Sequence, residues 1–156
     1  MRRKRNTKRD TMPDPAHDSI LVAKITNYLM YDGKKNTAER VMHDMFDVLQ
    51  KARKDEEPLQ VLETAIKNIS PAVEIRPRRV GGATYQVPRE INPDRKLALA
   101  IRWLVGAARG KKGKPMANRL ADEILLALKN EGSAIKKKQD THRMAEANRA
   151  FAHFAW

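Results

Sequence analysis

Apolar side chains recur at intervals of three and four residues in several stretches of this chain, and this periodicity most constrains its fold. Side chains at that spacing share one face of an α-helix, where they can be buried together. Capping residues, glycines and prolines delimit the stretches. They predict helices that begin near residues 18, 34, 58, 93 and 115, and a last helix over about 137–152. A length of 156 residues suits one domain. We therefore predict a mainly α fold, a single domain of about six helices over residues 16–156.

Individual positions follow from the same pattern. The first helix is expected to turn Ile20 and Tyr28 toward the core along with its other apolar residues. Gly132 is expected to cap the end of the fifth helix, since helices often end with a glycine in the left-handed conformation.

The helical pattern is interrupted over residues 73–91, between the third and fourth helices, where the sequence reads VEIRPRRVGGATYQVPREI. Gly81 and Gly82 lie between two extended runs. They predict a two-residue hairpin turn, because a type I′ turn needs positive φ at both central residues. Such a loop would pair Val80 with Ala83, Arg78 with Tyr85, and Arg76 with Val87.

Two prolines limit how this hairpin can sit in the fold. Pro77 and Pro88 are tolerated only where the N–H that they lack would point away from the partner strand. They favour a free-standing two-stranded β-ribbon that protrudes from the helical body. Arginines and one Tyr on such a ribbon suit a nucleic acid, since Arg binds phosphate and Tyr can stack on a base. The alternative is an ordinary hairpin packed on the core through the apolar residues at its base.

The formal net charge of +13 and the sequence pI of about 10.2 favour a polyanionic partner. Six of the first nine residues are basic: Arg2, Arg3, Lys4, Arg5, Lys8 and Arg9. Residues 1–15 are therefore predicted to form a flexible basic arm that becomes ordered on a polyanion. The alternative for the charge as a whole is a solvated surface.

The charge is unevenly distributed. Residues 40–70 hold five basic and six acidic residues, whereas residues 71–115 hold eleven basic and three acidic ones. The first segment is therefore interpreted as scaffold, and the second as the contact surface.

The fourth helix carries a row of arginines. Arg95, Arg102 and Arg109 are seven residues apart, so they lie on nearly one face at intervals of about 10 Å. A row of that kind can reach successive phosphates. The alternatives are a solvated face or the flank of a coiled coil.

Composition disfavours other functions. The chain has no cysteine, which excludes disulfides and thiolate metal sites, and no run long enough for a membrane span. Its four histidines lack a metal-binding spacing, and its acids show no pairing typical of acid–base catalysis. We predict no cofactor, no metal and no enzymatic activity, and a cytoplasmic location.

Several long motifs resemble one known family. They read MYDGKK over residues 30–35, RRVGGATYQVP over 78–88, PDR over 93–95, RWL over 102–104 and DTHRMAEANRAFAHF over 140–154. In order and spacing they resemble the bacterial small-subunit ribosomal protein S seven family, over nearly the whole chain after the basic arm. The resemblance implies a helical fold with a protruding β-ribbon.

The resemblance also implies a function. Members of the family bind the 3′ major domain of the small-subunit ribosomal RNA and nucleate assembly of the subunit head. Their ribbon lies beside the exit site for transfer RNA and the messenger RNA exit channel. Ribosomal proteins S nine and S eleven are the expected neighbours.

Charge pattern and resemblance together predict the contact residues. Contacts to ribosomal RNA are expected from Arg2, Arg3, Lys4, Arg5, Lys8, Arg9, Lys34, Lys35, Arg76, Arg78, Arg79, Arg89, Arg95, Lys96, Arg102, Arg109, Lys111, Lys112, Lys114, Arg119, Lys136, Lys137, His142 and Arg143. Proximity to exit-site transfer RNA is expected for the ribbon tip, Val80, Gly81, Gly82, Ala83, Thr84 and Tyr85.

Other RNA-binding roles stay open. Some members of the family also repress their own operon by binding its messenger RNA. A stand-alone messenger-regulating or DNA-compacting protein would have a similar composition. A role at a membrane surface is disfavoured, because no predicted helix combines a basic face with a broad aromatic one.

Overall fold

The structure is a computed structural model and describes residues 11–155. Its helices are α1 (Ile20–Leu29), α2 (Lys35–Ala52), α3 (Pro58–Ile69), α4 (Pro93–Gly110), α5 (Met116–Leu128), α6 (Ser133–Ala147) and the 3₁₀-helix η1 (Arg149–Phe154). Strands β1 (Val73–Val80) and β2 (Ala83–Glu90) form one antiparallel hairpin between α3 and α4. The predicted mainly α fold with this ribbon is confirmed.

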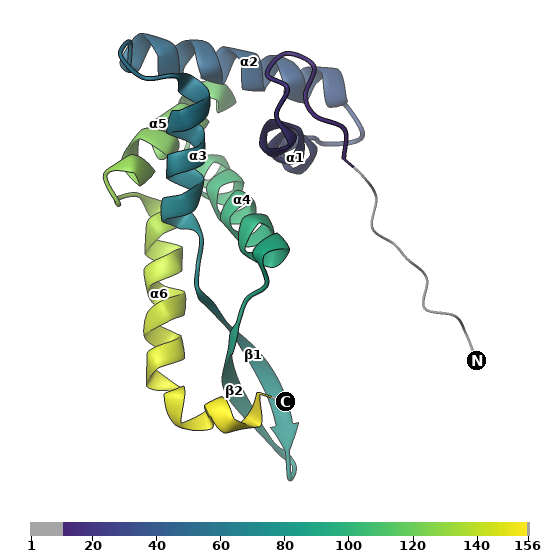
Figure 1. Cartoon of the computed structure of the whole chain (residues 1–156), viewed down its shortest axis with the longest axis vertical. Helices are drawn as coiled ribbons and strands as arrows, with labels where there is room; N and C mark the ends of the chain where they lie inside the picture. The colour runs from purple at the N-terminus through teal and green to yellow at the C-terminus, as the bar shows by residue number, and fades with distance from the viewer. Residues whose placement is uncertain (1–10, 156) are drawn as a thin grey trace, which may run out of the picture.

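The described part of the chain has two regions (Figure 1). Helices α1 to α5 pack together at one end, and we call them the body. The ribbon and α6 run away from the body, and η1 turns back across the ribbon at the far end. We call the ribbon, α6 and η1 the extension.

The apolar core lies mainly in the body. Its largest fully buried side chains come from all five helices and include Ile25, Met45, Leu49, Leu62, Ile69, Ile101, Leu104, Leu120 and Ile124. These residues keep the three-to-four spacing read from the sequence, which is why the helices were predictable. The first turn of α6 also joins this core, through Ala134 and Ile135.

The buried face of α1 differs from the prediction. Ile20 is 53% exposed and Tyr28 is 38% exposed, whereas Val22 and Thr26 are buried. Thr26 can be buried because its hydroxyl donates to the Val22 carbonyl oxygen at 3.0 Å within the helix.

The junction between α5 and α6 also corrects the prediction. The helix α5 ends at Leu128, and the residue with positive φ after it is Asn130, at 60°. The backbone N–H of Glu131 then donates to the Leu126 carbonyl oxygen at 2.9 Å, as in a Schellman motif. Gly132 is instead the N-cap of α6, which begins at Ser133 and not near residue 137.

The ribbon has the predicted register. Val80 pairs with Ala83, Arg78 with Tyr85, and Arg76 with Val87. Gly81 and Gly82 have φ of 58° and 88°, as a type I′ turn requires.

That register explains why both prolines are accommodated. Hydrogen-bonded and non-hydrogen-bonded pairs alternate outward from the closing Val80–Ala83 pair. Pro77 opposite Gln86, and Pro88 opposite Ile75, therefore occupy non-hydrogen-bonded pairs. Neither proline removes a hydrogen bond from the ladder.

The ribbon is not free-standing, which corrects the sequence-based prediction. The ring of Tyr85 lies 5.1 Å from the Phe151 ring and 5.5 Å from the Phe154 ring, centroid to centroid. Both phenylalanines belong to η1, so the C-terminal segment covers one face of the ribbon (Figure 1). A lone hairpin is only marginally stable in water, and this cover supplies apolar contact.

Candidate nucleic-acid interface

The structure divides the predicted contact residues into three groups. The basic residues of the arm, Arg2, Arg3, Lys4, Arg5, Lys8 and Arg9, lie outside the described residues. A second group has exposed side chains with no hydrogen-bond or ion-pair partner among residues 11–155: Lys34, Arg79, Arg89, Arg102, Lys112, Lys136, Lys137 and Arg143. The third group is engaged within the protein: Lys35, Arg76, Arg78, Arg95, Arg109, Lys111, Lys114, Arg119 and His142. Lys96 is half-buried and belongs to neither of the last two groups.

The arginine row on α4 contains both an exposed arginine without a partner and arginines that are engaged within the protein. Arg102 is exposed and has no side-chain partner in the described part of the chain. Arg95 is half-buried, and its Nε lies 3.1 Å from Oε2 of Glu74. The seven-residue spacing therefore does not give three equivalent guanidinium groups.

Arg109, at the end of α4, is held against the turn after α1. Its Nη2 donates to the carbonyl oxygens of Tyr28 and Leu29, at 3.3 and 3.2 Å. Its guanidinium carbon lies 4.2 Å from the centre of the Tyr31 ring, a cation–π contact. Arg109 is thus fixed in place while it stays exposed.

Glu74, on β1, ties the base of the ribbon to α4. It is buried, and its two carboxylate oxygens accept hydrogen bonds from Arg76 at 2.6 Å and from Arg95 at 3.1 Å. Burial alone would raise the pKa of this carboxyl, but the hydrogen bonds and charges of Arg95 and Arg76 outweigh it and lower the pKa. Glu74 therefore stays ionised and sets where both arginines lie.

Glu123, on α5, organises a second internal site. It is fully buried, and its Oε2 lies 2.6 Å from Nζ of Lys111. Its Oε1 accepts the backbone N–H of Ala134 at 2.9 Å, at the start of α6. Gly132 must be glycine here, because its φ is 96° and a Cβ would approach Oε1 of Glu123 to 2.8 Å.

The loop between α4 and α5 is consequently less available than its composition suggests. Lys111 pairs with Glu123, Nη1 of Arg119 donates to the Lys111 carbonyl oxygen at 2.6 Å, and Lys114 pairs with Asp122 at 2.8 Å. Lys112 keeps an exposed side chain without a partner in the described residues.

The ribbon separates arginines that are adjacent in the sequence. Side chains alternate between the faces of a strand, so Arg78 shares the face of Tyr85, which η1 covers, and Arg79 shares the open face. Arg79 is exposed, as are Gly81, Gly82, Ala83 and Thr84 at the tip. Tyr85 was expected to offer a stacking face near the tip, but both phenylalanines of η1 already contact it.

His142, on α6, is engaged internally. Its Nε2 accepts the backbone N–H of Ala72 at 3.1 Å, just before β1. Burial lowers the pKa of His142, and the nearby charge of Lys138 lowers it further. Lys138 itself donates to the Asn68 carbonyl oxygen at 2.7 Å. On the same helix, Lys136, Lys137 and Arg143 have exposed side chains.

Sequence reasoning missed the two organising acids, although weak signals for both exist. Glu74 and Arg76 are two residues apart on a strand and therefore share a face. Glu123 falls three residues after Leu120, on the apolar face of its helix, where an acid requires a buried partner. The identity of that partner, Lys111, has no local signal.

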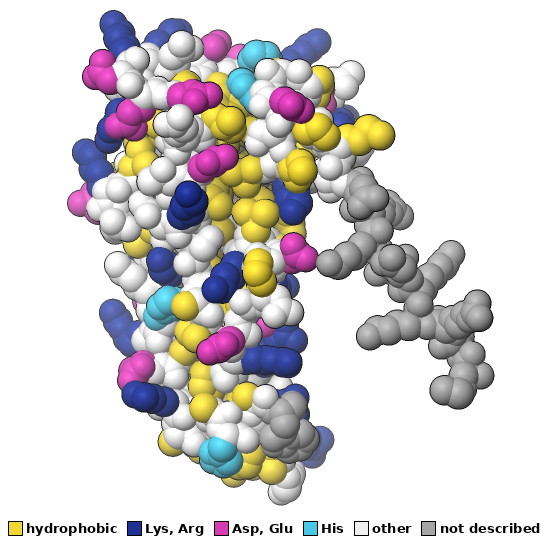
Figure 2. All heavy atoms as spheres, viewed as in Figure 1, with side chains coloured by type: hydrophobic (Ala, Val, Ile, Leu, Met, Phe, Trp, Pro, Cys, Tyr) yellow, Lys and Arg dark blue, Asp and Glu magenta, His cyan; other side chains and the backbone are white. Residues whose placement is uncertain are grey.

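The surface charge is uneven on the face drawn in Figure 2. Acidic and basic side chains are mixed over the end of the molecule that holds α2 and α3. Basic side chains gather along the edge beside the ribbon. Residues 11–155 contain no group of three His, Asp or Glu side chains that could hold a metal ion, and none of their helices is long and apolar enough to cross a membrane.

Comparison with known proteins gives one consistent result. The family model described as ribosomal protein S7p/S5e matches residues 1–149. The small ribosomal subunit protein uS7 of Thermotoga neapolitana is 55% identical over 157 residues, covering 100% of both chains. The protein of the same name from a Caulobacter species (strain K31) is 54% identical over 155 residues, covering 99% of each chain. The chain therefore belongs to the ribosomal protein S7p/S5e family.

Proposed function

We propose that this chain, as a structural constituent of the small ribosomal subunit, binds the 3′ major domain of the subunit RNA and nucleates assembly of the subunit head. Family membership over nearly the whole chain carries the first part: a ribosomal protein of the small subunit, bound to ribosomal RNA, and not an enzyme. Such a protein works in the cytoplasm, where ribosomes translate. The choice of RNA domain and the role in assembly follow from the resemblance of the motifs.

The exposed, unpartnered cations support the RNA-binding surface. Arg102 on α4, Arg79 and Arg89 on the ribbon, and Lys34 after α1 present charge that no acid in residues 11–155 neutralises. Phosphate contacts from such side chains would supply most of the affinity. Shape would select the site, because side chains cannot read the narrow major groove of an RNA helix.

Engaged cations have a different role in this proposal. Arg95 and Arg109 are held at defined positions by Glu74 and by the turn after α1. Fixed cations lose less side-chain entropy on binding than free ones. They would therefore present a preorganised part of the same surface.

The ribbon tip has a separate part in the proposal. Residues 80–85 would lie beside exit-site transfer RNA and near the messenger RNA exit channel, with ribosomal proteins S nine and S eleven as neighbours. The exposure of Gly81 to Thr84 at the far end of the molecule is compatible with such a contact (Figure 1). Repression of its own operon would be an additional role and would use the same RNA-binding surface.

Substitution of Arg102 tests the RNA-binding surface. Arg102→Glu is expected to weaken binding to the isolated 3′ major domain RNA at least tenfold. The slope of log affinity against log salt concentration should fall by about one, the value of one phosphate contact. The helical circular dichroism signal should stay unchanged, because Arg102 has no side-chain partner among residues 11–155. Arg95→Glu is a poorer test, since it would place a second acid beside Glu74.

Two controls accompany Arg102→Glu. Arg40→Glu makes the same charge change at an exposed site on α2, the scaffold side, and should bind nearly as the wild type does. Removal of residues 81–84 shortens the tip and should also leave RNA binding unchanged while it perturbs exit-site transfer RNA. Wild-type affinity for Arg102→Glu would show that the α4 surface does not bind this RNA. Loss of RNA binding on shortening the tip would refute the separate role of the tip.

A further inference from the structure

A partly open cavity of about 440 Å³ lies at the end of the body where four elements meet. The turn after α1, the first turns of α2, the end of α4 and the start of α5 line it. Its volume is in the range of pockets that hold small ligands. Nothing in the family match assigns a role to this cavity.

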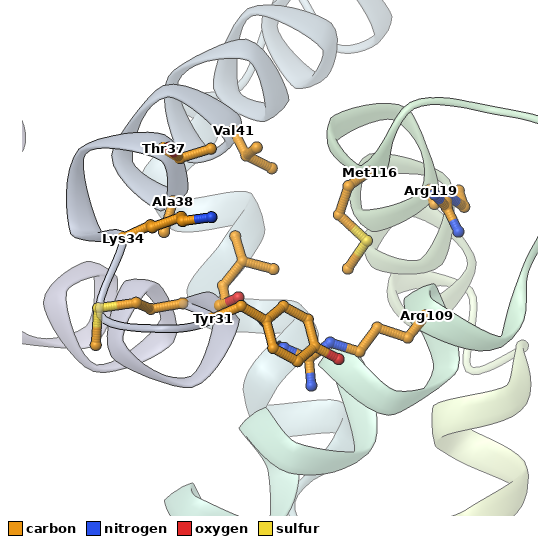
Figure 3. A pocket seen from close by; sticks show the side chains of 10 residues that line it. Tyr31, Lys34, Thr37, Ala38, Val41, Arg109, Met116 and Arg119 are labelled. Carbon is orange, nitrogen blue, oxygen red and sulfur yellow. Dashed lines mark hydrogen bonds between the residues drawn. The ribbon is translucent and has the colours of Figure 1, made fainter.

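The walls of the cavity are apolar. Val41 from α2 and Met116 from α5 project toward it from opposite sides (Figure 3), and both are only half-buried. Ala38 and Leu29 close it toward the core. Apolar side chains left partly in water favour an occupant with a flat or apolar surface.

One end of the cavity carries an aromatic ring. Tyr31 is 65% exposed, although it is a large aromatic residue. The guanidinium group of Arg109 lies against this ring, 4.2 Å from its centre (Figure 3). The hydrogen bonds of Arg109 to Tyr28 and Leu29 fix that arrangement. Arg109 covers one face of the ring, and the 65% exposure of Tyr31 leaves the rest of the ring open to an unpaired RNA base, which can stack on an aromatic side chain.

The charges around the cavity indicate what kind of molecule it takes. Three cations, Lys34, Arg109 and Arg119, line it, and no Asp or Glu does. Lys34 has no side-chain partner in the described residues, so its ammonium group can bind a phosphate. A polyanion with apolar faces, such as single-stranded RNA, complements this combination better than an apolar peptide segment, which would leave Lys34 unpaired and the positive charges of Arg109 and Arg119 without an anion.

We propose that this cavity receives one unpaired base of the bound RNA, which stacks on the part of the Tyr31 ring that Arg109 leaves open while its phosphate contacts Lys34. The inference rests on the proposed function and adds a base-binding subsite to it. Such a subsite would select RNA with an unpaired nucleotide at that point, which phosphate contacts alone cannot do.

Two substitutions test the subsite from opposite directions. Tyr31→Ala removes the stacking face, and Thr37→Phe places a ring at an exposed position that borders the cavity. Each is expected to weaken binding to the 3′ major domain RNA roughly tenfold, the effect of one stacked base. The salt dependence should stay unchanged, because the phosphate contacts remain. In footprints with base-modifying reagents, one unpaired base protected by the wild type should become reactive.

Matched variants separate this effect from misfolding. Tyr31→Phe keeps the ring and should bind as the wild type does. Thr64→Phe adds the same ring at an exposed position on α3, away from the cavity, and should also bind normally. All four variants should keep the wild-type melting temperature within a few degrees.

The outcomes distinguish the subsite from the proposed function. If Tyr31→Ala and Thr37→Phe keep wild-type affinity and the wild-type footprint while Arg102→Glu loses binding, the subsite is wrong and the proposed function stands. If the wild type itself does not bind this RNA, the proposed function fails. Normal RNA binding combined with loss of a neighbouring protein from reconstituted subunits would show that the cavity holds a protein side chain and would overturn the inference.

Discussion

The body and the extension are stabilised in different ways. In the body, five helices bury a continuous set of apolar side chains, many of them completely. In the ribbon, Val87 and Glu74 are the buried residues, and the tip is held by the rings of Tyr85, Phe151 and Phe154. Burial of apolar area stabilises the body, but it is non-directional. Hydrogen bonds have a preferred geometry, so those of Glu74 and His142 fix the orientation of the ribbon relative to α4 and α6. The extension can therefore keep a fixed orientation toward a partner, although it has no core of its own.

A core substitution in the body should have the largest effect on stability. Leu62 on α3 is 0% exposed, so Leu62→Ala leaves a cavity in the core. The expected loss in the free energy of unfolding is about 3 kcal/mol, measured by denaturant titration. Because the body forms one core, all spectroscopic probes should shift together.

The half-buried Leu59 on the same helix provides the control for Leu62. Leu59→Ala removes the same atoms from a position that is partly in water, so its cost should be well below half as large. Equal costs at the two positions would mean that the core of the body does not dominate stability.

Loss of the Glu74 carboxylate should have an intermediate effect, confined to the base of the ribbon. Glu74→Gln removes the negative charge from two hydrogen bonds with arginine, and the expected cost is about 2 kcal/mol. In hydrogen exchange, the amides of β1 and β2 should open more readily, whereas those of α2 and α3 should change little.

The lowered pKa of Glu74 also gives a pH dependence. The contribution of this carboxylate is present above the usual pKa of 4.5 and is lost as the pH falls through its lower folded value. The Glu74→Gln variant should lack this acid-induced loss. Uniform destabilisation of body and ribbon by Glu74→Gln would contradict the division into two regions.

Protonation of His142 should have the smallest effect. Its pKa is lowered in the folded state, so the unfolded chain takes up this proton at a higher pH than the folded chain does. The stability contribution is therefore complete above the usual pKa of 6.5 and is lost as the pH falls below it. Burial and the charge of Lys138 disfavour the protonated ring, and protonated Nε2 cannot accept the Ala72 N–H. Because the ring is only half-buried, the expected loss is at most about 1 kcal/mol, the value of one hydrogen bond.

Comparison with His142→Gln between pH 7.5 and pH 5 measures this effect. Glutamine offers an uncharged acceptor, so the variant should lose less stability on acidification than the wild type does. Identical pH profiles for the two proteins would exclude His142 as the link between α6 and the start of the ribbon.

Local patterns in the sequence accounted for most of the fold. The three-to-four spacing of apolar residues predicted the helices, and Gly81-Gly82 with the two prolines predicted the turn, the register and the outward N–H positions of the ribbon. Two local predictions were wrong. Thr26 is buried on α1 whereas Ile20 is exposed, and Thr26 satisfies its hydroxyl within the helix. Gly132 precedes α6, where Glu123 from α5 packs against it and accepts the Ala134 N–H.

The candidate interface was only partly readable from the sequence. The number of cations, the segments that hold them and the family of the chain depend on residue order alone, so they could be read without a structure. Tertiary structure decided which cations are free. Arg95, Lys111 and Arg102 look alike in the sequence, but Glu74 and Glu123, from distant segments, engage the first two and leave Arg102 exposed. Ion pairing depends on distances of a few ångströms between segments, and only the packed fold sets those distances.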